Sequence, residues 1–372
     1  MRLAPASQPA HKRKEPINLL KGSPNPSLHP TRLLLQAAQT VLSDPSLSTP
    51  ALGYGPEQGH PPLLTNLATW LTNFYQPCTV AVTAERLAIT GGASQNLGNM
   101  LAVFTNPEET LAVWLVAPAY FLAFGIFEDA GLAMRAVPED EQGLDLEYLE
   151  REIERSENES AIAEEETQSR EAKVGSKSIR KGKVFRHVIY CVPSFSNPSG
   201  RTMSLDRRRG SVRLARRHDA LVICDDVYDF LQWPAKHSDT AADGGAMLRP
   251  ATAHLPRVVD VDRIDGGTDR EGADGFGNAI SNGSFSKIAG PGLRCGWVEG
   301  TQKFAYGVSQ TYVFLLAIPS CTTCGYSFSI PRLQRLTLHF SCCSSAIMFF
   351  YTTPDCCSHY WFPSQPRYDI QS

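Results

Sequence analysis

The chain has 372 residues, a formal net charge of −3, 42% hydrophobic residues and 20% charged residues. These values are typical of a globular protein, and the missing basic excess argues against a general nucleic-acid binder. No apolar run reaches the ~18 residues of a membrane-spanning helix, so we expect no membrane partner. The first residues are basic without the apolar core of a secretory signal. We therefore take the cytoplasm as the default compartment and leave a mitochondrial location open.

Residues 1–50 are predicted to form an N-terminal arm. It begins with a polar lead-in, continues with a short apolar piece that ends in turn residues near Gly22, and contains a helix near 31–43. A rigid loop with Tyr54 follows, and its glycine spacing differs from a dinucleotide-binding fingerprint. Apolar residues at helical spacing predict another helix over 62–76.

Short apolar strands alternate with helices through the large domain, which we place at residues 51–310. The predicted strands cover 86–90, 111–116, 187–192 and 220–224. This alternation predicts an α/β fold with a mostly parallel sheet and helices on both faces. Ligands bind such sheets at the carboxyl ends of the strands, where this chain carries polar residues.

Two segments interrupt the alternation. Residues 150–183 are dense in charged side chains and poor in large apolar ones, so we expect a flexible insertion. Residues 235–280 are rich in Gly and Asp and are expected to form a second insertion around a possible strand at 257–261.

The polar residues after the strands, with a lysine segment near 281–294, suit one cofactor. A glycine turn before a helix presents N–H groups to an anion, and an accessible lysine amine can condense with an aldehyde. Arginine and serine side chains bind phosphate, and a carboxylate can partner a pyridinium nitrogen. This combination predicts pyridoxal phosphate. The candidate residues are Ala93, Ser94, Tyr120, Asn197, Asp225, Tyr228, Ser284, Ser286, Lys287 and Arg294.

The segments GGASQ, PAY, NPSG, DDVY, SFSK and PGLR stand in an order that resembles the fold-type-I, class I/II pyridoxal-phosphate aminotransferases. The resemblance is nearest to the branch of 2-aminoadipate and kynurenine aminotransferases. It covers residues 17–308 apart from the two insertions. It implies transamination between an amino acid and a 2-oxo acid, within amino acid metabolism or biosynthesis.

The resemblance also implies catalytic roles for the matching residues. Lys287 would form the Schiff base with the cofactor and carry the proton, and Asp225 would keep the ring nitrogen protonated. Tyr228 and Asn197 would bind the 3′ oxygen of the ring, and Tyr120 would stack on its face. No metal is implied.

Binding roles follow from the same resemblance. Gly22 and Asn197 would contact the substrate, and Tyr54 would reach the phosphate of a neighbouring subunit, which implies a homodimer. The cofactor phosphate of the same subunit would be bound by Ala93, Ser94, Ser284 and Arg294, with Ser286 as a further candidate.

Residues 311–372 do not continue this pattern. They contain six of the ten cysteines and lack lysine and glutamate. A metal module and a disulfide unit are alternatives, but we favour an unspliced intron or a shifted reading frame. The small C-terminal domain of the family is then missing or replaced. We assign no counterpart to the second arginine, which binds the substrate carboxylate in the family.

Two other functions stay open at this point. Ser284 and Lys287 have the spacing of an S-x-x-K acyl-transfer pair, although the companion S-D-N and K-T-G elements are absent. The chain could also be a truncated or mis-spliced aminotransferase relative with little or no activity.

Overall fold

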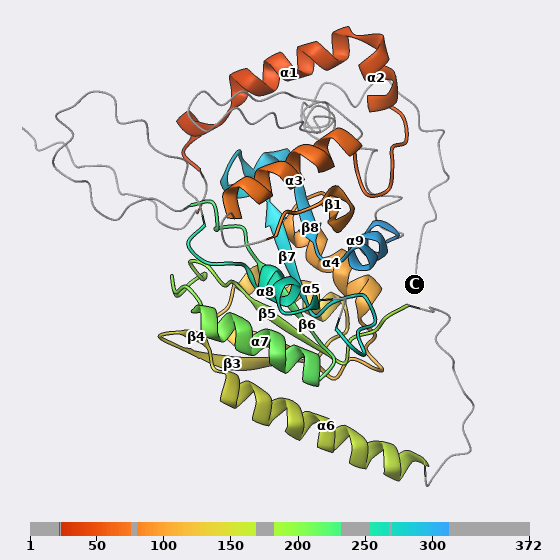
Figure 1. The fold of residues 1–372 in the computed structure, drawn as a ribbon, viewed down its shortest axis with the longest axis vertical. Coiled ribbons are helices and arrows are strands. Elements are labelled where there is room, and N and C mark those ends of the chain that lie inside the picture. Colours follow the sequence, from red (N-terminus) through yellow and green to blue (C-terminus); the bar gives the residue numbers. More distant parts are fainter. Residues whose placement is uncertain are drawn as a thin grey trace, which may run out of the picture.

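A mixed β-sheet runs through the centre of the protein (Figure 1). The computed structural model describes residue 22 and residues 24–75, 80–168, 182–231, 253–267 and 270–311. In the described part, eight strands lie in the order β1-β8-β7-β6-β5-β2-β3-β4. The strands are β1 (Leu87–Thr90), β2 (Ala112–Ala117), β3 (Met134–Asp140), β4 (Gly143–Leu144), β5 (His187–Cys191), β6 (Ala220–Asp225), β7 (Ala279–Ser284) and β8 (Gly296–Glu299).

The strands are parallel in the middle of the sheet and antiparallel at its two ends. Strands β3, β2, β5, β6 and β7 pair in parallel, whereas β8 is antiparallel to both β7 and β1. Because β8 reverses direction between them, β1 points the same way as β7. The carboxyl ends of β1, β7, β6, β5 and β2 therefore meet at one edge of the sheet, where the sequence predicted the site.

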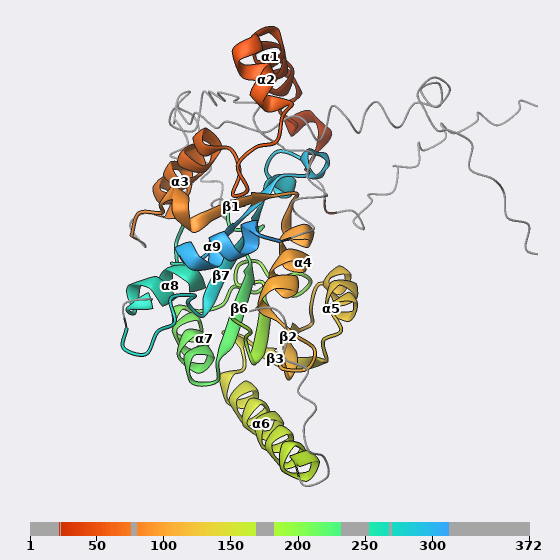
Figure 2. The ribbon, with the colours of Figure 1, turned by 90° about the vertical axis from the view of Figure 1, so that its right-hand side faces the viewer.

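Helices cover both faces of the sheet, because alternate residues of the buried strands face opposite sides (Figure 2). On one face, Ile189 and Val222 pack in a cluster with residues of α6, α7 and α8. On the other face, Val188 and Ile223 pack with residues of α4, α5 and α9. These helices are α4 (Ala93–Phe104), α5 (Phe124–Asp129), α6 (Leu146–Gln168), α7 (Leu205–Arg217), α8 (Val258–Ile264) and α9 (Gln302–Ser309).

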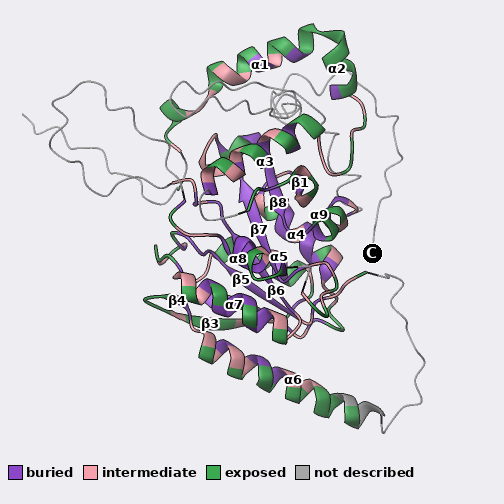
Figure 3. Ribbon diagram, in the orientation of Figure 1, coloured by how far each residue is buried: buried purple, intermediate pink, exposed green. Residues whose placement is uncertain are grey.

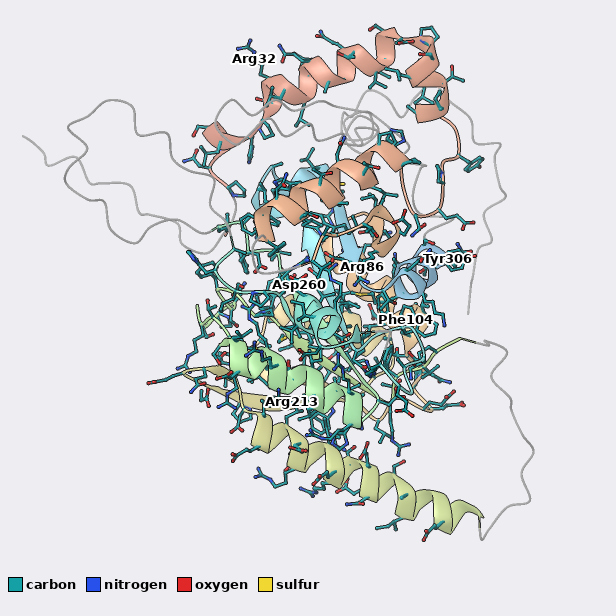
Figure 4. All side chains as sticks on the ribbon, viewed as in Figure 1. Arg32, Arg86, Phe104, Arg213, Asp260 and Tyr306 are labelled. Atoms are coloured by element: carbon teal, nitrogen blue, oxygen red, sulfur yellow. The ribbon has the colours of Figure 1, made fainter. Side chains whose placement is uncertain are left out.

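Among the described residues, three α-helices precede the sheet in the chain. They are α1 (Thr31–Ser43), α2 (Pro45–Ala51) and α3 (Pro61–Tyr75), and short 3₁₀ turns occupy Pro26–Leu28, Ala84–Arg86, Phe121–Ala123, Phe285–Lys287 and Pro291–Leu293. Helix α3 buries Leu67 and Leu71 in a cluster with Ile89 and Trp297 of the sheet. Helices α1 and α2 are largely exposed and lie beyond α3, with Arg32 at the margin of the view (Figures 3 and 4).

Helix α6 corrects the expectation of a flexible insertion over residues 150–183. Residues 150–168 are helical, and only residues 169–181 of that range lie outside the described part. The first turns of α6 bury Leu149 and Ile153 against the sheet. Further along, Arg155 pairs with Glu159 four residues later at 2.9 Å, an arrangement that favours helix. The apolar first turns of α6 thus fix the helix to the sheet, and the charged residues that follow continue it.

The possible strand at 257–261 is also wrong, because Val258–Ile264 forms α8. Asp260 accepts the backbone N–H of Arg257 at 3.0 Å, which satisfies a free donor at the start of the helix. Val258 and Val261, three positions apart, share a buried face. The run of valines suggested β-structure, but the hydrogen bond between Arg257 and Asp260 and the helical spacing of the buried valines favour a helix.

Several predictions lie outside the described residues. These are the polar lead-in at the start of the chain, residues 235–252 and 268–269 of the second insertion, and residues 312–372 of the cysteine-rich tail. Within the described part, no helix combines the length and apolar character needed to cross a lipid bilayer.

Candidate functional site

A cavity of about 200 Å³ opens at the carboxyl edge of the sheet. It brings together residues from five parts of the chain that are far apart in sequence. The predicted residues in its lining are Ala93, Ser94, Tyr120, Asn197, Asp225, Tyr228, Ser284, Ser286, Lys287 and Arg294. All of the predicted cofactor residues except Tyr54 therefore share one cavity.

Asp225 is a buried carboxylate in the lining of this cavity. It is the last residue of β6, and only 9% of its surface is exposed. Tyr190 on the neighbouring strand donates a hydrogen bond to Asp225 Oδ2 at 2.8 Å, whereas Oδ1 is buried and has no partner among the described residues. Burial raises the pKa of Asp225 to about 6, against the opposing effects of the Tyr190 hydrogen bond and the Lys287 charge.

Two phenols and an amide also line the cavity. Asn197 Nδ2 donates to the Tyr228 hydroxyl at 3.2 Å, so these two polar groups face the same space. Burial raises the pKa of Tyr228, and burial also raises the pKa of Tyr120. Both hydroxyls therefore keep their protons near neutral pH and can donate hydrogen bonds.

Lys287 enters the cavity from a short 3₁₀ turn, Phe285–Lys287, that follows β7 directly. Its Nζ atom lies 5.9 Å from the centre of the Tyr228 ring. It donates a hydrogen bond of 2.8 Å to the backbone carbonyl of Gly22. The N-terminal arm thus reaches the lysine, and Gly22 lies beside the predicted reactive amine although it does not line the cavity.

Another part of the cavity lining can accept an anion. Helix α4 begins after Gly92 without a side-chain cap, so its first backbone N–H groups and the positive end of its dipole are available. Arg294 adds a positive charge, and Ser284 Oγ donates to Ser286 Oγ at 2.9 Å beside it in the lining. A phosphate group suits this combination of donors.

Gly92 is required for the approach of that arginine. Its φ angle is +108°, and a Cβ atom built on it would lie 2.9 Å from Arg294 Nη2. Any side chain at this position would therefore force the guanidinium group away from the start of α4. The positive φ angle and the close contact with Arg294 explain why a glycine stands at this position.

The sequence did not single out three polar residues that complete the site: Tyr190, Asn96 and Asn282. Asn96 Nδ2 donates to Asn282 Oδ1 at 2.7 Å and to the Trp297 carbonyl at 3.0 Å, and Asn282 Nδ2 donates to the Ala93 carbonyl at 3.1 Å. These bonds tie the start of α4 to β7 and β8. An amide side chain inside an otherwise buried segment is the signal that would have revealed Asn96 and Asn282.

Tyr54 is the predicted cofactor residue that the structure leaves apart. It is 100% exposed in the single chain and lies in the loop between α2 and α3. Its assignment to a neighbouring subunit stays a prediction.

The acyl-transfer alternative does not fit the hydrogen bonds of the site. Ser284 Oγ pairs with Ser286 Oγ, and Lys287 Nζ donates to the Gly22 carbonyl. Within the described part of the chain, the serine and the lysine are thus engaged with other partners. A nucleophile and its base need a direct hydrogen bond, so this arrangement gives the alternative no support.

Comparisons with known proteins agree with the geometry. A family model described as aminotransferase class I and II matches residues 18–323. An uncharacterized protein of Saccharomyces cerevisiae is 34% identical over 300 residues, which are 76% of this chain and 63% of that protein. The mitochondrial kynurenine/α-aminoadipate aminotransferase of Mus musculus is 27% identical over 313 residues, covering 82% of this chain and 62% of that protein.

A solved structure shares the fold. The α-aminoadipate aminotransferase of Thermus thermophilus, crystallised with N-(5′-phosphopyridoxyl)-L-leucine, aligns with a TM-score of 0.56 at 24% identity. The alignment covers 88% of this chain and 62% of that protein. The chain spans about three fifths of the length of these relatives.

Proposed function

Because the chain belongs to the class I and II aminotransferase family, we propose that it transfers an amino group between an amino acid and a 2-oxo acid with pyridoxal phosphate. The observation that carries the proposal is the cavity in which Lys287, Asp225 and the positive start of α4 face one another. An amine, a buried carboxylate and an anion site are the three groups that this cofactor requires.

The donor set of the cavity fits the cofactor. Pyridoxal phosphate supplies an aldehyde that condenses with an amine. Its ring withdraws electrons from the carbon atom bonded to the amine nitrogen. The unpartnered Oδ1 atom of Asp225 supports a ligand that carries its own N–H donor, because a buried acceptor without a partner is costly. The uncapped start of α4 supports a phosphate.

Lys287 and Asp225 divide the proton chemistry between them. Lys287 Nζ is the group that we assign to hold the cofactor and to move a proton at the Cα atom of the substrate. Its present partner, the Gly22 carbonyl, is neutral and accepts a hydrogen bond from it. Asp225, buried in the cavity lining, would hold a proton on the ring nitrogen through its negative charge.

The phenol and amide groups orient the cofactor. Tyr228 and Asn197 would donate hydrogen bonds to the ring oxygen, and their mutual contact of 3.2 Å keeps both donors on the same side of the cavity. Tyr120 would cover one face of the ring. Arg294, Ser284 and the start of α4 would bind the phosphate and so hold the ring against Asp225.

Substrate binding and subunit assembly are further parts of the proposal. Gly22 and Asn197 are assigned to the substrate, and the contact between Gly22 and Lys287 supports this assignment. The full exposure of Tyr54 supports a homodimer in which this side chain reaches the site of the other subunit. The related kynurenine/α-aminoadipate aminotransferase makes an amino acid with a long side chain a reasonable first substrate to test.

Reduction of the bound cofactor tests the proposal directly. We would incubate the full chain with pyridoxal phosphate, reduce it with borohydride and locate the phosphopyridoxyl mass by peptide mapping. The expected site is Lys287, with no labelling after Lys287→Ala. Lys303→Ala is the matched control, because Lys303 lies on α9, donates to the Asp274 carbonyl and does not line the cavity.

A panel of amino acids then separates an active enzyme from a truncated relative. Addition of a substrate amino acid should convert the bound cofactor to its amino form and release the 2-oxo acid. Labelling of Lys287 without this conversion would support the alternative of a cofactor-binding relative with little activity. Labelling spread over several lysines, with Lys287 unmodified, would refute the proposed site.

A further inference from the structure

Tyr190 and Asp225 form a buried pair whose geometry follows from the register of two strands. Tyr190 on β5 is aligned with Ile223 on β6, and Asp225 follows Ile223 by two residues on the same face of the sheet. A side chain as long as tyrosine can extend along the strand and reach that carboxylate. The resulting bond from the Tyr190 hydroxyl to Asp225 Oδ2 measures 2.8 Å.

The remainder of the Tyr190 side chain is held by packing. Its ring is 2% exposed and meets the Phe127 ring of α5 edge-on, with 5.5 Å between their centres. Burial and the neighbouring Asp225 charge raise the pKa of Tyr190 well above its ordinary value, so its hydroxyl keeps its proton and acts as the donor. Tyr190 therefore offers Asp225 a fixed donor.

We propose that Tyr190 is a positioning residue that holds the Asp225 carboxylate in one orientation for the ring nitrogen of the cofactor. The inference rests on the proposed function for the identity of that ring. Occupation of Oδ2 by Tyr190 leaves Oδ1 without a partner among the described residues. Tyr190 and Asp225 both line the cavity.

A second tyrosine–aspartate pair provides a matched control. Tyr75 donates a hydrogen bond of 2.9 Å to Asp229 Oδ2, and both residues are at most 2% exposed. Asp229 Oδ1 is likewise unpartnered in the described part of the chain. Neither residue lines the cavity. Tyr75→Phe therefore removes a similar buried bond without touching the site.

The test replaces Tyr190 by phenylalanine, which removes the hydroxyl and keeps the ring against Phe127. Affinity is measured by calorimetry for pyridoxal phosphate and for its analogue in which CH replaces the ring nitrogen. We expect Tyr190→Phe to weaken the binding of pyridoxal phosphate by about 10-fold, since hydrogen bonds to charged groups contribute on that order. Binding of the analogue should be unchanged, and Tyr75→Phe should affect neither ligand.

A measurement without cofactor completes the test. The Asp225 carboxyl is titrated by carbon-13 NMR and assigned by its loss in Asp225→Asn. We expect Tyr190→Phe to raise the pKa of this carboxyl by about one pH unit, because the lost hydrogen bond favoured the charged form.

The outcomes separate this inference from the proposed function. Equal weakening for both ligands, or an unchanged Asp225 pKa in Tyr190→Phe, would overturn the positioning role. If wild-type protein binds neither ligand, the proposed function fails. The titration then decides alone whether Tyr190 controls the Asp225 carboxylate.

Discussion

Asp225 and Asp260 are both buried carboxylates beside the same sheet, yet their surroundings differ. Both oxygens of Asp260 receive hydrogen bonds of 2.9 Å from the Arg257 guanidinium, and the backbone N–H of Arg257 adds a third. Asp225 receives one bond, from Tyr190, and its other oxygen has no partner in the described part of the chain. A fully paired buried charge is part of the fold, whereas an unpaired one needs a ligand.

The two groups also connect different parts of the molecule. Arg257 donates to Glu299 Oε2 at 2.6 Å and lies 3.9 Å from the centre of the Tyr75 ring, so it joins α8, β8 and α3. Asp260 lies in the body of the protein near Arg86 (Figure 4). Asp225 instead faces the cavity at the end of β6. Mutations in the two regions should therefore change different properties.

The largest effect is expected from Arg257→Met, which removes the fully buried cation between Asp260 and Glu299 and leaves Arg263 to face both carboxylates. Removal of one member of a buried ion pair costs about 3–5 kcal/mol, so the free energy of unfolding should fall by that amount. Urea denaturation at pH 7.5 measures it. The control is Arg155→Ala, which breaks an exposed pair with Glu159 and should cost under about 0.5 kcal/mol. Equal losses in the two variants would remove the distinction between a structural and an exposed pair.

In the protein without cofactor, Asp225→Asn should raise the free energy of unfolding, whereas Arg257→Met lowers it. Burial raises the pKa of Asp225 to about 6, so its charged form destabilises the fold at pH 8. Removal of that charge should raise the free energy of unfolding by about 1–3 kcal/mol, since each pH unit of pKa change corresponds to ~1.4 kcal/mol. The same variant should bind pyridoxal phosphate more weakly. A destabilised Asp225→Asn protein would contradict the comparison.

The pH dependence gives this prediction its sign. A carboxyl group with a raised pKa destabilises the folded state only while it is ionised there and ionises more easily in the unfolded chain. The stability difference between wild type and Asp225→Asn should therefore be largest above pH 7. It should decrease as the pH falls through about 6 and disappear near the ordinary aspartate pKa of 3.8. Denaturation curves at a series of pH values measure the difference, and a gap that widens in acid would refute the assignment.

Gly92→Ala is expected to have the smallest effect on stability and a selective effect on the site. The positive φ angle and the contact with Arg294 should cost about 1–2 kcal/mol. Binding of pyridoxal phosphate should weaken more than binding of pyridoxal, which lacks the phosphate. Gly292→Ala is the control, because no atom lies within 4 Å of the Cβ position there. Equal weakening for both ligands would mean that Arg294 does not bind the phosphate.

Local sequence patterns predicted much of the fold and of the site. The apolar runs at 111–116, 187–192 and 220–224 became β2, β5 and β6, and the helices near 31–43 and 62–76 became α1 and α3. The polar motifs after the strands were predicted to face a common site, and residues of these motifs line one cavity. These features depend on short-range rules of burial, turn chemistry and strand direction, which can be read along the chain.

Features that depend on contacts between distant residues were decided only by the tertiary structure. β8 inserts between β1 and β7, α8 replaces the possible strand at 257–261, and α6 extends through the charged residues 150–168. Tyr190 looked like one more apolar strand residue until the register with β6 placed its hydroxyl against Asp225. The residue types and their order were set by the sequence, whereas long-range packing and register chose their partners, because those free energies belong to pairs that no local window contains.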